Sequence, residues 1–132
     1  MDETKSQQRY VTYEQAQQLK QLGYSSDCSN VYHYDGNKVE FIPDYCGELR
    51  NYNNSDVFGL HVYSAPSIYE AFKWLLDKFA IYVRVDYEDK DEWFYHLCLY
   101  PGHGFEDYYG KLYASYDDAL TAGISSALQS LI

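Results

Sequence analysis

The sequence predicts an α+β domain: a mainly antiparallel sheet of four to six strands with three helices packed on one face. Three observations predict it: three helix starts of one form, amphipathic stripes after two of them, and pairs of alternating apolar segments separated by turn residues. The expected order is α-β-β-(β)-α-β-β-(β)-α. At 132 residues, the chain is expected to form a single domain over 1–132, with 1–9 flexible.

Each expected helix begins with a hydroxyl residue, then a bulky apolar residue, with an acid or amide three positions after the hydroxyl. The segments are Thr12–Ala16, Ser67–Ala71 and Ser115–Ala119. The hydroxyl can accept a hydrogen bond from a free backbone N–H of the first turn. Gln15 and Glu70 are long enough to return a hydrogen bond to the first residue, which predicts two capping boxes.

Apolar residues at helical spacing follow these starts. The second helix carries a stripe from Ile68 to Phe79, and the third carries one from Ala119 to Leu131. Gly123 lies on the third stripe, where glycine costs about 1 kcal/mol relative to alanine. We therefore expect another backbone to approach it closely. The first helix has a weaker stripe and is expected to end near Gly23.

The strands are expected as hairpins. Val31–Tyr34 and Lys38–Ile42 flank a strong turn signal, Asp35-Gly36-Asn37. Ala80–Tyr87 and Glu92–Tyr100 both alternate in hydrophobicity and form the second hairpin. Short additional strands are expected at Val57–Tyr63 and Lys111–Tyr113. The polar segment Pro43–Asp56 is expected to be a surface loop and the most mobile part of the chain.

Acidic residues dominate the charge. Lys and Arg number 10 and Asp and Glu number 20, so the formal net charge is −10. A field of this sign opposes direct binding to nucleic acid or to an anionic membrane. The acids are densest at the expected second hairpin turn, at Asp86, Glu88, Asp89, Asp91 and Glu92. Two interpretations are open: a solvated tip that aids solubility, or a patch that attracts a basic protein partner.

The sequence contains no recognisable membrane-spanning or signal segment, so we expect a cytoplasmic protein. No apolar run approaches the length needed to span a bilayer, and the first residues lack the order of a signal peptide. The cysteines, Cys28, Cys46 and Cys98, are odd in number and widely spaced, so we expect reduced thiols rather than disulfides or a zinc site. No cofactor motif is present, and none is expected.

Seventeen tyrosines are the least usual feature of the composition. Tyrosine suits a half-buried strand, because its ring packs while its hydroxyl stays in water. It also suits a protein-binding surface. On the second interpretation, we expect Tyr82, Tyr108 and Tyr109 to contribute to binding together with the acidic turn.

Catalytic motifs are missing from the sequence, so we expect a protein that is not an enzyme. The alternative is a small-molecule-binding protein or enzyme with a site near His103, Glu106 and Tyr109, where a histidine between glycines precedes two carboxylates. The histidines show no metal-ligand spacing.

Several segments resemble small proteins of unassigned activity encoded in prophage-rich bacterial genomes. The resemblance is carried by Thr12–Ala16 with Leu19, Leu22, Gly23 and Tyr24, by Ala65–Ser67 with Ala71, Trp74 and Leu75, and by Ser115–Ala119. It implies a link to phage or other mobile elements and transfers no catalytic residue.

These observations predict a small acidic protein that binds another protein through an anionic, tyrosine-bearing surface. One version is a nucleic-acid mimic, in which carboxylates replace phosphates and block a basic partner. Self-association through an open strand edge is a further possibility.

Overall fold

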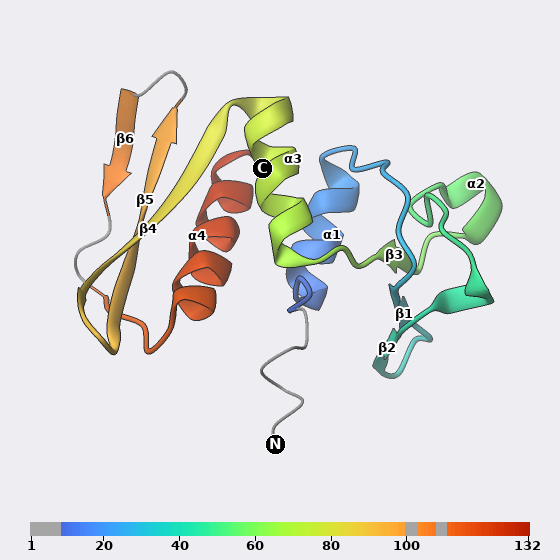
Figure 1. Cartoon of the computed structure of the whole chain (residues 1–132). Helices are drawn as coiled ribbons and strands as arrows, with labels where there is room; N and C mark the ends of the chain where they lie inside the picture. Colours follow the sequence, from blue (N-terminus) through green and yellow to red (C-terminus); the bar gives the residue numbers. More distant parts are fainter. Residues whose placement is uncertain (1–8, 100–102, 108–110) are drawn as a thin grey trace. The chain divides into compact units, whose positions relative to one another are not determined.

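The computed structural model describes residues 9–99, 103–107 and 111–132 and confirms the α+β class. The elements in chain order are α1 (Tyr13–Gln21), β1 (Val31–Tyr34), β2 (Val39–Ile42), η2 (Tyr45–Gly47), α2 (Ser55–Phe58), β3 (Val62–Ser64), α3 (Ile68–Phe79), β4 (Ile81–Asp89), β5 (Glu92–Leu99), β6 (His103–Asp107) and α4 (Tyr116–Ser130) (Figure 1). This order follows the expected alternation of helices and hairpins only roughly, because η2 and α2, which were not expected, lie between β2 and β3.

The expectation of one continuous sheet is wrong. The strands of the described residues form two three-stranded antiparallel sheets, with orders β2-β1-β3 and β4-β5-β6. Each hairpin acquires its third strand from nearby in the chain, which keeps the closed loops short. Two compact units result, one within residues 9–67 and one within 68–131. The single domain over 1–132 stays a prediction.

In the first unit, α1 packs against β3. Its start has the expected capping box: the Gln15 N–H donates to Thr12 Oγ1 at 3.1 Å, and the Thr12 N–H donates to Gln15 Oε1 at 2.9 Å. Lys20, in the last turn, extends its ammonium group to the Val62 carbonyl at 2.9 Å. Removal of this ammonium from water lowers the pKa of Lys20.

The segment Pro43–Asp56 is more structured than a polar surface loop. It contains η2 and the beginning of α2, and its Tyr52 is fully buried beside Val31 and Val62. Asn53 ties the segment to the rest of the unit, since its amide donates to the Tyr24 carbonyl at 3.0 Å and accepts from the Ser64 N–H at 2.9 Å. A polar sequence therefore folds around one aromatic anchor.

Two expected short strands lie elsewhere. The strand expected at Val57–Tyr63 is β3, Val62–Ser64, because Asn54 caps the helix α2 ahead of it by accepting from the Asp56 N–H. The strand expected at Lys111–Tyr113 is reduced to a single bridge between Tyr113 and Trp93, and β6 supplies the third strand instead.

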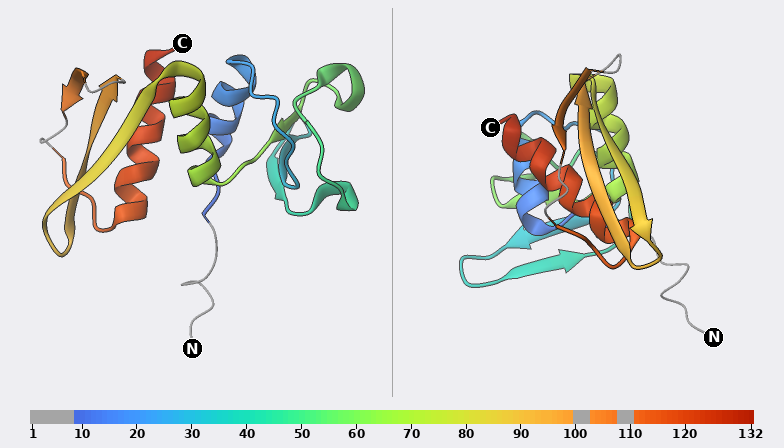
Figure 2. Two further views of the ribbon diagram at one scale, coloured as in Figure 1. Left: turned by 45° about the horizontal axis from the view of Figure 1, so that its top comes forward. Right: turned by 90° about the vertical axis from the view of Figure 1, so that its left-hand side faces the viewer.

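In the second unit, α4 packs against β4 and β5, and α3 packs against β4 and α4 (Figure 2). The alternation expected for the hairpin is confirmed at the start of β4, where Ile81 and Val83 are buried and Tyr82 and Arg84 are exposed. In β5 the expected alternation of burial is not seen, because the four residues from Phe94 to Leu97 are all buried. The strand pairing places Val83 opposite Leu97, so both side chains lie on the helix-covered face. This helix-covered hairpin extends beyond α4 to the acidic turn.

Candidate functional site

The acidic hairpin tip, Asp86 to Glu92, is exposed at every residue. Asp89 pairs with Glu92 at the turn, and a register shift between Tyr87 and Asp89 marks a bulge there. The tip carries five carboxylates and one base, Lys90. Within the described part of the chain, none of these carboxylates forms an ion pair with a lysine or arginine. The tip therefore presents its negative charge to solvent.

Three contacting rings adjoin the carboxylates of the tip: Tyr87 within the tip, Trp93 directly after it, and Tyr116. We call these rings the aromatic row. The Tyr87 and Trp93 ring centroids are 5.2 Å apart, and those of Trp93 and Tyr116 are 5.8 Å apart. Tyr87 is 61% exposed and Tyr116 is 43% exposed, with Trp93 half-buried between them. Such rings offer a broad contact surface with little side-chain entropy to lose.

Local geometry explains this row. Tyr87 and Trp93 are directly paired across the hairpin, and so point to the same face. The Trp93 indole N–H donates to the Lys90 carbonyl at 3.1 Å, which fixes the ring to the turn. Tyr116 is the first residue of α4, so the start of that helix places the third ring. The helix start and the hairpin turn lie at the same end of the unit in Figure 1.

A lysine side chain of this protein lies over a neighbouring tyrosine ring. The Lys111 ammonium lies 5.4 Å from the centroid of Tyr113, whose backbone pairs with that of Trp93. Attraction between a cation and an aromatic face contributes about 0.5–1 kcal/mol at an exposed site. The chemistry of this end of the unit thus suits positively charged side chains.

The tyrosines expected at the binding surface are placed differently. Tyr82 points to the opposite face of β4 from Tyr87, and its ring contacts Phe72 of α3, with centroids 5.6 Å apart. Four residues of strand lie between Tyr82 and Tyr87, so their backbones are about 16 Å apart. Tyr82 therefore does not join the acidic hairpin tip. Tyr108 and Tyr109 lie outside the described residues.

The alternative site around residue 103 is described in part. The backbone of His103 pairs with that of Leu99 and the backbone of Glu106 with that of Leu97, both within β6 and β5. Tyr109 lies outside the described residues. Among the residues that the structure does describe, no group of three or more His, Cys, Asp and Glu side chains is placed to hold a metal ion.

The first unit contains a feature that the sequence analysis did not identify: an open groove of about 600 Å³. It is lined by Asp27, Glu48, Leu49, Arg50, Asn51, Asn54, Val57 and Phe58. A two-way backbone pairing between Cys28 and Arg50, with N···O distances of 2.9 and 3.1 Å, joins the two chain segments that contain the lining residues Asp27 and Arg50. The run of asparagines at 51, 53 and 54 was the available sequence signal, because their amides hold turns.

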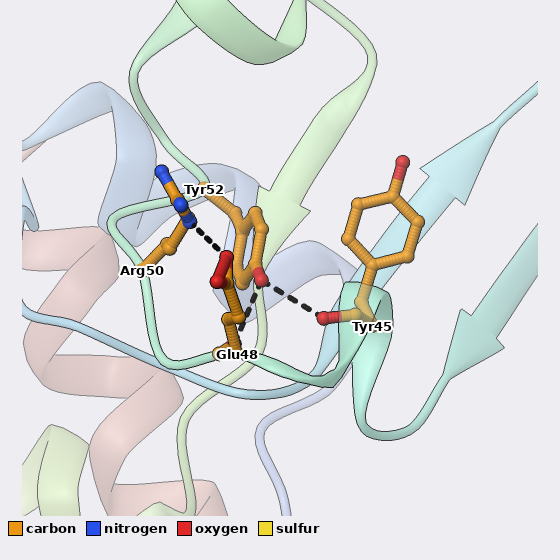
Figure 3. Close-up of polar contacts among 4 residues, drawn as sticks. All are labelled: Tyr45, Glu48, Arg50 and Tyr52. Carbon is orange, nitrogen blue, oxygen red and sulfur yellow. Dashed lines mark hydrogen bonds and ion pairs between the residues drawn. The ribbon is translucent and has the colours of Figure 1, made fainter.

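The buried Tyr52 fixes the chain from Tyr45 to Glu48. Its hydroxyl lies 2.8 Å from the Tyr45 carbonyl and 2.7 Å from the Glu48 carbonyl, and donates its single hydrogen to this pair (Figure 3). Arg50 Nε donates to Glu48 Oε1 at 2.6 Å. This hydrogen bond lowers the pKa of Glu48 and raises that of Arg50.

None of the helices in the described residues is long and apolar enough to cross a membrane. Comparisons of the chain with protein-family models, with curated proteins and with solved structures find no match.

Proposed function

We propose that this protein is a protein-interaction module without catalytic activity, and that it binds a basic protein segment through the acidic hairpin tip and the aromatic row. The single observation that carries the proposal is their adjacency: five solvent-exposed carboxylates border three contacting rings of which two are exposed.

The two features complement each other. Exposed carboxylates attract lysine and arginine over a distance set by ionic screening, about 8 Å at physiological salt. The rings then provide the short-range contact, because aromatic residues and arginine are the usual anchors of protein interfaces. A solubilising tip alone would gain nothing from the neighbouring Tyr87 and Tyr116.

A short basic segment fits this arrangement better than a protein that normally grips a nucleic-acid duplex. Mimicry of a duplex needs carboxylates distributed along an extended face, whereas these five lie within seven consecutive residues. The nucleic-acid mimic is therefore the less favoured version of the proposal. We place the interaction in the cytoplasm, with a host protein or a product of a mobile element as the partner.

Binding of a fluorescent oligolysine peptide, measured by anisotropy at 50 and 300 mM salt, tests the electrostatic part. We expect the affinity to fall at the higher salt. The variant D86N/E88Q/D89N/D91N/E92Q should lose this binding. The matched control, E14Q/D27N/E40Q/D44N/D56N, removes five exposed acids from the first unit and should bind as the unmodified protein does.

Tyr87→Ala tests the aromatic part, with Tyr82→Ala as its control on the opposite face of β4. An oligoarginine peptide should lose several-fold in affinity for Tyr87→Ala and little for Tyr82→Ala. Equal binding by the two fivefold variants would mean that only net charge matters, and would overturn the proposal.

A further inference from the structure

Several side-chain hydrogen-bond donors at the groove of the first unit have no acceptor within the described residues. Asn51 Oδ1 accepts from the Asn53 N–H at 3.1 Å, and Asn54 Oδ1 accepts from the Asp56 N–H at 3.1 Å. A backbone N–H can only donate, so each amide must present its oxygen inward to the turn and its NH₂ group elsewhere. Among the described residues, neither NH₂ group has a hydrogen-bond partner.

Arg50 adds further donors. Its guanidinium has N–H groups on three nitrogens, and within the described chain only Nε is bonded, to Glu48. Both side chains are about half exposed, so the remaining N–H groups are accessible to a ligand. The donors of Arg50, Asn51 and Asn54 all belong to residues that line one groove. A carboxylate, which only accepts hydrogen bonds, matches this set.

The other lining residues, an acid and a set of apolar side chains, indicate what the rest of the ligand should carry. Asp27 is exposed, and the antiparallel pairing of Cys28 with Arg50 places its backbone opposite that of Asn51. It offers a negative charge near the donors. Leu49 and Val57 are 68% and 64% exposed, and together with Phe58 they form an apolar part of the lining.

We propose that this groove binds a small zwitterion of the α-amino-acid class with an apolar side chain. The ligand carboxylate bonds to Arg50, Asn51 and Asn54, its ammonium group pairs with Asp27, and its side chain covers Leu49, Val57 and Phe58. A simple anion fits less well, because Asp27 and Glu48 outweigh Arg50 and leave the lining with a net negative charge. The volume of about 600 Å³ is within the range of small-molecule sites.

Titration of the ¹⁵N-labelled full chain with L-leucine and with L-phenylalanine tests the proposal. We expect at least one of them to shift the amide resonances of residues 27 and 49–58. L-leucinamide lacks the carboxylate and N-acetyl-L-leucine lacks the ammonium group, so both should bind at least tenfold more weakly than L-leucine. No shift with either amino acid at 20 mM would overturn the proposal.

Variants assign the roles. Arg50→Gln should weaken binding about tenfold, because it removes the charge-assisted bonds to the carboxylate. Glu48→Gln should strengthen it, because it releases Arg50 from its internal partner. Lys38→Gln, an exposed change in the β1–β2 turn outside the groove, serves as the matched control. Since these side chains are exposed, the variants should fold, which unchanged resonances of α1 would verify.

Two results would separate this site from other possibilities. If N-acetyl-L-leucine binds as tightly as L-leucine, the ammonium group has no role, and the groove would instead suit the C-terminus of a peptide. If Arg50→Gln and Lys38→Gln bind L-leucine equally, the carboxylate is not held as proposed. Either result contradicts the proposal and leaves the function of the acidic hairpin tip unaffected.

Discussion

Gly123 of α4 lies against Val83 of β4 so closely that a Cβ atom at position 123 would overlap Val83 Cγ1. The same Cβ would also approach the Tyr95 ring to 3.1 Å. The absence of a side chain at this position therefore lets the helix lie directly on the hairpin. The helix is further joined to β5 by a hydrogen bond of 2.5 Å between the Tyr95 hydroxyl and Ser126 Oγ.

Gly123→Ala is expected to destabilise the protein even though alanine favours a helix. Alanine contributes about 1 kcal/mol through helix propensity, whereas overpacking a core costs about 1–3 kcal/mol. We expect a lower urea midpoint. The double variant Val83→Ala/Gly123→Ala should be more stable than the sum of the two single changes predicts, since Val83→Ala removes the clashing methyl group. Strict additivity would contradict the close approach.

Tyr52→Phe tests the anchor of the segment at residues 43–56. The change leaves the ring packed but removes the hydroxyl that bonds to the Tyr45 and Glu48 carbonyls. Loss of such a buried bond should lower the free energy of unfolding by about 1–2 kcal/mol, measured by urea titration. Tyr45→Phe is the control, because the Tyr45 hydroxyl has no hydrogen bond within the described residues. Similar losses in the two variants would contradict this role.

Thr12→Ala removes half of the capping box at the start of α1. The Gln15 N–H would lose its acceptor, and we expect a loss of about 1 kcal/mol in unfolding free energy. Thr12→Ser keeps the hydroxyl oxygen and should retain most of the stability. The measurement is the thermal midpoint of each variant. Equal midpoints for the alanine and serine variants would show that the hydroxyl does not cap the helix.

Alkaline pH is expected to destabilise the fold through three tyrosines. Burial raises the pKa of Tyr13, Tyr32 and Tyr52 above the ordinary value of 10.0, and for Tyr13 the neighbouring Tyr63 adds to the effect. The neutral phenol is thus favoured in the folded state. The contribution of these neutral phenols to the free energy of unfolding is fully present below pH 10. It is lost as the pH rises through the raised pKa values.

Urea titrations between pH 8 and pH 11 measure this loss. Tyr32→Phe should show a shallower decline above pH 10 than the unmodified protein, because one of the three titrating groups is removed. The Tyr32 hydroxyl also donates to the Val11 carbonyl at 2.6 Å, so the variant should be less stable at neutral pH. An unchanged slope would mean that Tyr32 ionises equally in the folded and unfolded states.

Features that depend on residues close in the chain were predicted from the sequence. The start of α1 at Thr12, the turn at Asp35–Asn37 and the inward face of β4 all follow from local hydrogen bonding or from the alternation of side chains. The exposed acidic hairpin tip follows as well, since a turn rich in carboxylates cannot be buried without partners. At Gly123 the close approach was expected from another backbone, whereas the atoms nearest to a Cβ at that position belong to the side chains of Val83 and Tyr95.

The tertiary structure alone decided the division into two sheets, the burial of Tyr52, the contact of Trp93 with Tyr116, and the groove beside Arg50. Each of these joins segments whose partners are not specified by local pattern. Many strand pairings bury similar apolar area, and the one adopted depends on loop closure and on the packing of all elements together. Tyr52 in particular lies in a polar stretch, and its burial is favourable because Val31, Val62 and the partly buried Ile42, Tyr45 and Phe58 surround it.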